Sequence, residues 1–136
     1  KWLKEKDCVV VEFGQTAGYD SCLGISAHGL QLRPVMSMVN QCDIIICIDS
    51  FIMHLAIALN IKCIPLFGIT DSEHYTPMKS NIFPISSSSS YSKSHHFQKS
   101  YHSRWFTPSI NKDMENCMDS IEVKEVTEKV QEILGI

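Results

Sequence analysis

The sequence lacks the features that mark several large classes of protein. Acidic residues outnumber basic ones by 15 to 12, and the net charge is -3. A chain without basic excess is poorly suited to binding the phosphate backbone of nucleic acids. The longest apolar runs, 44–48 and 61–67, fall far short of the roughly 18–20 residues of a membrane span. The charged residues 1–6 also lack the apolar core of a secretory signal. We therefore expect no nucleic-acid partner and a cytoplasmic location.

Cysteine pairs with metal-ligand spacing are missing as well. The chain has six cysteines but no C-x-x-C motif. Several lie beside or inside apolar runs, where a thiol behaves as a small hydrophobic group. We expect these residues to be reduced and structural, with no bound metal: Cys8, Cys22, Cys42, Cys47, Cys63 and Cys117.

The common nucleotide-binding fingerprints are absent too. The glycines between residues 14 and 29 do not form G-x-G-x-x-G, and no Gly-Lys-Ser/Thr sequence occurs anywhere. A hydrolase triad of Ser26, His28 and Asp20 is a weak hypothesis, because no G-x-S-x-G motif surrounds the serine. The histidines at 95, 96 and 102 could bind stray metal, but their biased surroundings favour a surface loop.

What is present predicts an α/β fold in one domain spanning residues 1–136. Hydrophobic residues make up 44% of the chain, which is enough for one core. The run Ile44–Ile48 has no polar alternation, which is typical of a strand buried on both faces of a parallel sheet. The expected strands are 9–13, 44–48, 61–67 and 81–85, and the expected helices are the end of one at 1–6, then 34–42, 52–60 and 121–134.

The remaining segments are expected to be loops. Residues 14–29 are rich in glycine, residues 69–79 are polar, and about 86–104 is a flexible Ser/His-rich stretch. Pro65 lies inside the strand 61–67 and predicts an edge position or a bulge there.

The residues that could carry chemistry follow the predicted strands. Asp49 and Ser50 come directly after strand 44–48, and His54 follows Ser50 by one helical turn. In open parallel sheets, ligands bind outside the carboxyl ends of the strands, where a helix N-terminus can hold an anion. An acid, a helix N-terminus and an imidazole suit a nucleotide diphosphate sugar. The alternative is an ordinary helix cap at Ser50 with a structural or exposed histidine.

The run from Cys42 to Thr70 resembles the donor site of family 9 glycosyltransferases, the ADP-heptose:lipopolysaccharide heptosyltransferases. The family pattern is an acid, an apolar strand, Asp-Thr/Ser-Gly-x-x-His, an Ala-rich helix, a Pro-containing strand and Phe/Tyr-Gly-x-Thr. It is matched by Asp43, Ile44–Ile48, Asp49-Ser50, His54, Pro65 and Phe67-Gly68-Ile69-Thr70. The family's glycine is replaced by Phe51.

The resemblance implies a Rossmann-like sheet flanked by helices, as in the C-terminal donor domain of a GT-B enzyme. Asp49 would then contact sugar hydroxyls, Ser50 and the following backbone N–H would hold phosphate, and His54 would add a phosphate contact. Phe51, Gly68 and Thr70 complete the donor-binding set, while the catalytic residues are unknown. Such enzymes use no metal or other cofactor, and an N-terminal domain supplies the base.

These observations predict the donor-binding C-terminal part of a transferase. It would move a heptose-like sugar from a nucleotide diphosphate, such as ADP-heptose, to a cell-surface glycan or lipopolysaccharide. The acceptor would bind through an N-terminal domain, and peripheral attachment to the inner face of the membrane is compatible with this role. Formation of a homo-oligomer is a further possibility, because the edge strand of a truncated sheet can pair with a strand of a second copy. The alternative is a non-catalytic Rossmann-like module that binds a nucleotide or a protein.

Overall fold

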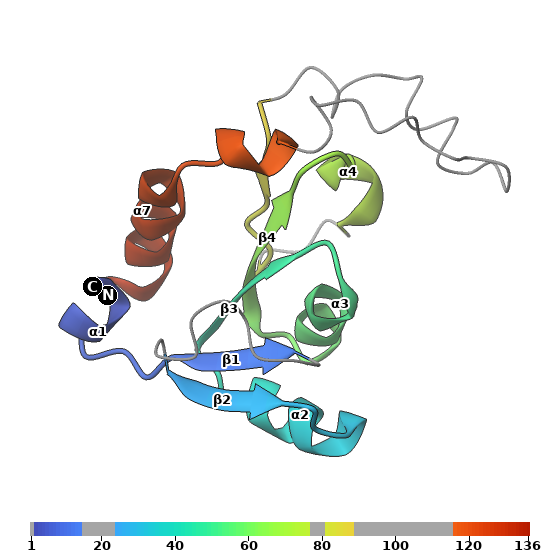
Figure 1. The fold of residues 1–136 in the computed structure, drawn as a ribbon, viewed down its shortest axis with the longest axis vertical. Coiled ribbons are helices and arrows are strands. Elements are labelled where there is room, and N and C mark those ends of the chain that lie inside the picture. Colours follow the sequence, from blue (N-terminus) through green and yellow to red (C-terminus); the bar gives the residue numbers. More distant parts are fainter. Residues whose placement is uncertain (1, 15–23, 77–80, 89–115) are drawn as a thin grey trace, which may run out of the picture. The chain divides into compact units, whose positions relative to one another are not determined.

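A computed structural model describes residues 2–14, 24–76, 81–88 and 116–136. The contacts divide the chain into two compact units, one of residues 1–42 with residue 136 and one of residues 43–135. Each unit contains parallel strands and helices, so the predicted α/β class is confirmed (Figure 1). No helix among the described residues is long and apolar enough to cross a membrane.

The first unit is built on two short parallel strands. It contains α1 (Trp2–Glu5), β1 (Val11–Gly14), β2 (Ile25–His28) and α2 (Leu32–Val39). The prolyl ring of Pro34 lies in the first turn of α2, as predicted, where its missing N–H breaks no helical hydrogen bond. Val39 is fully buried and anchors the helix.

Strand β2 corrects the prediction that residues 14–29 are mostly loop. β2 forms because β1 offers it a parallel partner, with Val11 opposite Ile25 and Gly14 opposite His28. The approach is close: a Cβ on Gly24 would lie 2.0 Å from the carbonyl oxygen of Val10. Glycine is therefore required at that point, and its presence in the sequence suggested a loop. Residues 15–23 lie outside the described part of the chain.

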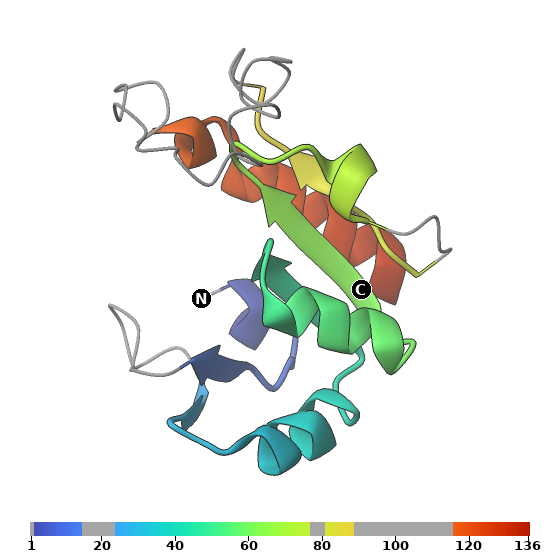
Figure 2. The same cartoon turned by 90° about the vertical axis from the view of Figure 1, so that its right-hand side faces the viewer.

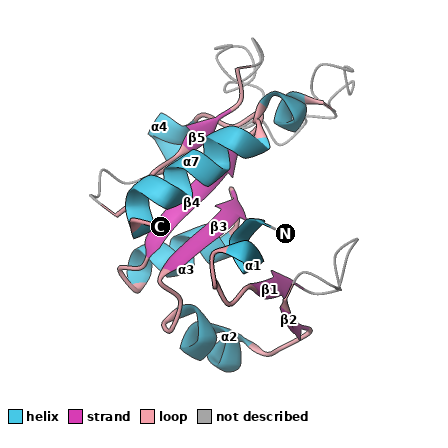
Figure 3. Ribbon diagram, turned by 90° about the vertical axis from the view of Figure 1, so that its left-hand side faces the viewer, coloured by secondary structure: helices cyan, strands magenta, loops and turns pink. Residues whose placement is uncertain are grey.

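The second unit is a three-stranded parallel sheet in the order β3-β4-β5. Its elements are β3 (Ile44–Ile48), α3 (Phe51–Ala58), β4 (Lys62–Phe67), α4 (Ser72–Tyr75), β5 (Ile85–Ser86), the 3-10 helix η1 (Cys117–Ser120) and α7 (Val123–Leu134). Figures 2 and 3 view the sheet from opposite sides and show α3 on one face and α7 on the other. The Lys62 ammonium donates to the carbonyl of Ile133 and ties β4 to α7.

The prediction that strand 61–67 is an edge strand because of Pro65 is wrong. β4 is the central strand, and Pro65 pairs with Cys47 of β3. The N–H and C=O of Cys63 point toward residues 81–83. Backbone groups two residues apart in a strand point to the same side, so the nitrogen of Pro65, which carries no hydrogen, also faces that side. Pairing on that side is described only at Ile82 and again from Ile85. The proline therefore falls where the ladder is interrupted.

Strand β3 is not buried on both faces, contrary to the prediction from its apolar run. Ile45 is buried, but Ile46 is 40% and Ile48 is 59% exposed. The two exposed side chains point to one face of β3, opposite to the face of Ile45. β3 is at the edge of the three-stranded sheet, so α7, which is tied to the central strand, leaves this face partly open.

Two segments predicted as loops contain ordered structure. Within 69–79, Asp71 caps α4 by accepting a 2.9 Å hydrogen bond from the N–H of Glu73. Within the Ser/His-rich stretch, Ser87 is 1% exposed, and its hydroxyl bonds Cys117 and Ser120 of η1. The rest of that stretch, from residue 89 onward, lies outside the described residues. Both errors arise because short polar elements form through side-chain hydrogen bonds rather than hydrophobic periodicity.

The C-terminal helix matches its prediction closely. α7 spans Val123–Leu134, Val130 is 1% exposed, and Gly135 ends the helix with a φ of 71°. Only glycine adopts such a left-handed conformation at little cost. Val123, which the sequence pattern assigned to the apolar face, is 79% exposed at the start of the helix. Burial begins one turn later.

Candidate functional site

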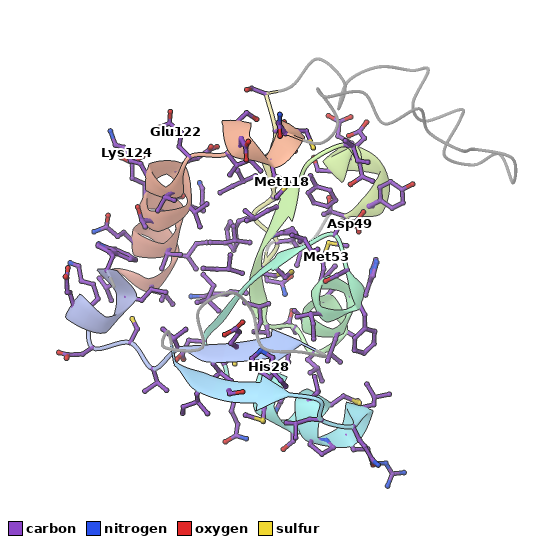
Figure 4. All side chains as sticks on the ribbon, in the orientation of Figure 1. His28, Asp49, Met53, Met118, Glu122 and Lys124 are labelled. Carbon is purple, nitrogen blue, oxygen red and sulfur yellow. The ribbon has the colours of Figure 1, made fainter. Side chains whose placement is uncertain are left out.

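Asp49 and Ser50 form the connection between β3 and α3. β3 and β4 run parallel, with Ile48 opposite Leu66, so the segments that follow both strands leave the same edge of the sheet. Asp49 and Ser50 are both half-buried. Figure 4 shows Asp49 where β3 passes into α3. The predicted acid and the first turn of the helix are therefore adjacent at this edge.

Ser50 begins α3, but its hydroxyl does not cap the helix. Its backbone is extended, with φ −157° and ψ 173°, and its carbonyl accepts hydrogen bonds from the N–H groups of Met53 and His54. The alternative interpretation, an ordinary helix cap by the Ser50 side chain, is wrong, because no cap hydrogen bond forms. The first N–H groups of a helix have no acceptor in its own turn. They carry partial positive charge that favours an anion.

His54 lies on the outer face of α3. Its neighbours Met53 and Leu55 are buried, whereas His54 is exposed. It is one turn beyond Ser50, on the same side of the helix. The buried residues that hold α3 in place are Met53, Leu55, Ala56 and Ile57. The imidazole is therefore open to solvent beside the helix N-terminus rather than part of the core.

Phe51 occupies the first position of α3, where the family pattern has glycine. Its side chain is 55% exposed, so the ring is not buried between helix and sheet. It shares the outer face of the helix with His54, three residues later. An apolar ring and an imidazole thus flank the first turn.

Gly68 and Thr70 follow β4. A Cβ on Gly68 would lie 2.8 Å from the sulfur of Cys117 and 2.8 Å from that of Met118. Glycine is needed here because η1 packs directly on the backbone, and Figure 4 labels Met118 there. Thr70 is half-buried and precedes Asp71, the cap of α4. Gly68 therefore has a packing role at the same sheet edge as Asp49.

Two thiols lie beneath this edge. Cys47, two residues before Asp49, has its sulfur 3.7 Å from that of Cys63 on β4. The hydrogen bond with Cys63, burial and the charges of Cys63 and Asp49 raise the pKa of the Cys47 thiol. The same hydrogen bond lowers the pKa of the Cys63 thiol. A donated S–H stabilises a thiolate on the accepting sulfur, which explains the opposite directions.

A second polar cluster lies on β1 and β2. The Ser26 hydroxyl is 2.7 Å from Nδ1 of His28, and Oε1 of Glu12 is 3.4 Å from Nε2. Figure 4 labels His28 on this sheet. Sequence reasoning paired Ser26 and His28 with Asp20, which lies outside the described residues. It missed Glu12 because β2, which places Ser26 opposite Glu12, was not predicted. The spacing of Ser26 and His28, two residues apart as on one face of a strand, was the sequence signal that could have predicted β2.

The described residues contain no group of three or more His, Cys, Asp or Glu side chains that could hold a metal ion. None of the five cysteines within the described ranges takes part in a disulfide, and Cys22 lies outside them. The arrangement at the β3 edge is therefore one of hydrogen-bond donors, a carboxylate and an imidazole. Such groups can bind a polyhydroxylated anion by hydrogen bonds and charge, without forming a covalent bond to it.

Comparison with known proteins places the chain. No curated relative and no solved structure matched it. The model of glycosyltransferase family 9 (heptosyltransferase) matches residues 20–104. The matched part covers β2 through β5, including the edge at Asp49, and amounts to more than half of the 136 residues. The chain therefore belongs to glycosyltransferase family 9.

Proposed function

We propose that the chain is the donor-binding part of a glycosyltransferase, holding a nucleotide diphosphate sugar at the carboxyl edge of β3. The observation that carries the proposal is at Ser50, whose hydroxyl leaves the first turn of α3 uncapped beside Asp49. Membership of family 9 supports glycosyl transfer with a nucleotide sugar and an acceptor. Asp49 would bind sugar hydroxyls, and the amides after Ser50 would bind the diphosphate.

His54 has a separate role in this proposal. Its exposed ring is one turn from Ser50 and can donate a hydrogen bond to a phosphate oxygen. Thr70 and Gly68 follow the neighbouring strand and would border the sugar. The positioned donors would stabilise charge on the departing diphosphate, which is the usual electrostatic contribution to such a transfer. We assign the base for the acceptor hydroxyl to an N-terminal domain of a GT-B arrangement.

The donor in this proposal is a heptose-like sugar on a nucleotide diphosphate, such as ADP-heptose, and the acceptor is a cell-surface glycan or lipopolysaccharide. The family description is the support for the heptose. No metal or other cofactor is required, because the helix N-terminus supplies positive potential to the diphosphate. Residues 1–136 would serve as one partial domain in that enzyme, working in the cytoplasm or at the inner face of the membrane.

The test is a titration followed by amide chemical shifts. ADP and an ADP-sugar are added separately to the 15N-labelled protein. We expect the largest shifts at Ser50, Phe51 and His54, because these residues border the diphosphate. Inorganic phosphate at the same ionic strength is the control for nonspecific anion binding. Shifts confined to β1 and β2, or no shifts at all, would refute the assignment of the donor site.

The exposed phenyl ring of Phe51 favours a second candidate, a binding module without turnover. A bulky side chain at the first helical position hinders close approach of a diphosphate to the backbone, whereas an exposed ring suits an apolar or planar partner. The variant Phe51→Gly separates the two. Tighter ADP binding by Phe51→Gly than by the parent protein would favour the module, because the parent ring would then be an obstacle to the donor. Equal or weaker binding supports the transferase.

A further inference from the structure

Cys47 and Cys63 are in contact across neighbouring strands of the sheet. Their sulfur atoms are 3.7 Å apart. Cys63 is opposite Ile45, and Cys47 is opposite Pro65, so the two cysteines are diagonal neighbours on one face. Cys63 is fully buried, whereas Cys47 is half-buried. Cys47 is therefore the more accessible residue of the pair.

The remaining cysteines of the described segments have other surroundings. The Cys8 thiol donates to the carbonyl of Lys6, and the Cys42 thiol donates to the carbonyl of Met38. Cys117 is packed against the backbone of Gly68. The hydrogen bond between thiols that the structure describes joins Cys47 to Cys63. The pair is therefore the place in this part of the chain where oxidation can be resolved within the molecule.

We propose that Cys47 and Cys63 are a redox pair whose disulfide alters the strand end that carries Asp49. Peroxide is the oxidant. The Cys47 sulfur attacks one peroxide oxygen, which breaks the O–O bond, gives a sulfenic acid and releases water. The Cys63 thiolate then attacks the Cys47 sulfur, the S–S bond forms, and hydroxide leaves and takes up the proton lost by Cys63. Overall, two thiols and one hydrogen peroxide yield one disulfide and two waters.

Closing this bond requires movement of the strands. A disulfide holds its sulfurs about 2.0 Å apart, and the two thiols are now 3.7 Å apart along a diagonal of the ladder. Diagonal neighbours two residues apart along parallel strands have Cα atoms roughly 8 Å apart, whereas a disulfide usually spans Cα atoms no more than about 6.8 Å apart. Rotation of the side chains must therefore be accompanied by a shift of β3 against β4. Asp49 is two residues beyond Cys47, so it moves with the strand. The effect on the donor depends on the proposed function, whereas formation of the bond does not.

The pH dependence of oxidation follows from the surroundings of Cys47. The hydrogen bond with Cys63, burial and the charge of Asp49 raise its pKa. The titratable residue of α3, His54, is on the outer face of that helix. Because the thiolate is the reactive form, the rate of peroxide oxidation should rise by up to about tenfold per pH unit between pH 7 and 9. A rate independent of pH would contradict this assignment of the attacking thiol.

The experiment maps the cysteines after oxidation. The reduced full chain is treated with hydrogen peroxide, alkylated under denaturing conditions, digested and analysed by mass spectrometry. We expect a linked peptide that contains Cys47 and Cys63, lighter by two hydrogen atoms and released by dithiothreitol. Recovery of both residues as alkylated thiols, or links to other cysteines instead, would overturn the proposal.

Matched variants and a binding measurement complete the test. Cys42→Ser keeps the pair and should still form the link, whereas Cys47→Ser and Cys63→Ala should both abolish it. ADP binding is then measured on reduced and oxidised parent protein, and we expect oxidation to weaken it at least about fivefold. A linked protein with unchanged ADP affinity would refute the effect on the site. Absence of ADP binding in the reduced protein would refute the proposed function, and the link would still be judged by the peptide map.

Discussion

At the scale of single residues, the carboxyl edge of β3 is defined by one acid and by one serine that does not cap the following helix. Asp49 is half-buried beside Ser50, whose hydroxyl makes no bond to the helix that it begins. The diphosphate and the sugar would use different groups: backbone amides for the former and the Asp49 carboxylate for the latter. Substitution of the acid should therefore separate the two parts of the ligand.

The variant Asp49→Ala is expected to weaken binding of an ADP-sugar by about thirtyfold and binding of ADP by less than about threefold. The reason is that two charge-assisted hydrogen bonds to sugar hydroxyls, each contributing roughly 1 kcal/mol or more, are lost. Isothermal titration calorimetry with both ligands measures the difference. Asp43→Ala, at an exposed acid before β3, is the control for net charge. Equal losses for both ligands would show that Asp49 does not bind the sugar.

Gly68 shows how a residue of a family motif can be required for packing. Its missing side chain leaves room for the sulfur atoms of Cys117 and Met118, each 2.8 Å from where a Cβ would lie. Gly68→Ala should lower the free energy of unfolding by about 1–3 kcal/mol, because η1 must shift to admit the methyl group. Urea denaturation measures this free energy of unfolding, and Ser37→Ala, at a solvent-exposed position, is the control. An unchanged midpoint would mean that η1 moves at no cost.

At the scale of elements, hydrogen bonds from serines hold the end of β5 to η1. The Ser87 hydroxyl lies 2.7 Å from the Cys117 carbonyl and 2.8 Å from the Ser120 hydroxyl, and the Ser88 N–H donates to Ser120. These bonds join two segments that are about thirty residues apart in the chain. They hold η1 in its position against Gly68, at the sheet edge that follows β4.

Removing the buried hydroxyl tests this connection. Ser87→Ala removes a buried hydroxyl and leaves the carbonyl of buried Cys117 with one hydrogen-bond donor fewer, so we expect a loss of about 1–3 kcal/mol in unfolding free energy. The neighbouring Ser86→Ala removes an exposed hydroxyl, whose hydrogen bond to the Ser72 hydroxyl can be replaced by water, and should cost less than about 0.5 kcal/mol. Thermal unfolding followed by circular dichroism compares the two. Similar midpoints for both variants would argue against a stabilising role for Ser87.

At the scale of the whole molecule, the chain forms two compact units with separate buried residues. Val39 is fully buried in the first unit, and Ile64 and Phe67 are fully buried in the second. The family match begins inside the first unit and extends through β5 of the second. Local stability can therefore differ between the units, because each has its own strands and its own packed helix.

The variant Ile64→Ala is expected to destabilise the second unit by about 2–5 kcal/mol, since it leaves a cavity in the sheet between α3 and α7. Amide hydrogen exchange should accelerate most in β3 and β4 and least in β1 and β2. Val39→Ala provides the reciprocal case, with faster exchange expected in the first unit. Uniform acceleration throughout the chain in both variants would mean that the two units unfold together.

The sequence alone determined the α/β class, the positions of β3, α3, β4 and α7, and the order of Asp49, Ser50 and His54. Apolar runs and helical periodicity are local signals, and they persist whatever the elements pack against. It did not determine β2, because that strand exists only through its pairing with β1. Nor did it determine which strand is central, since that depends on the ladder around Pro65 rather than on the residue itself.

The tertiary structure decided how particular side chains are used. It left the Ser50 hydroxyl out of the helix cap, buried Ser87 within a stretch that the sequence predicted to be a loop, and brought Cys47 and Cys63 into contact. Each of these depends on a partner that is distant in the chain or on a backbone angle, and no periodicity records either. Local patterns fix the elements, and the register between strands fixes which chemical groups meet.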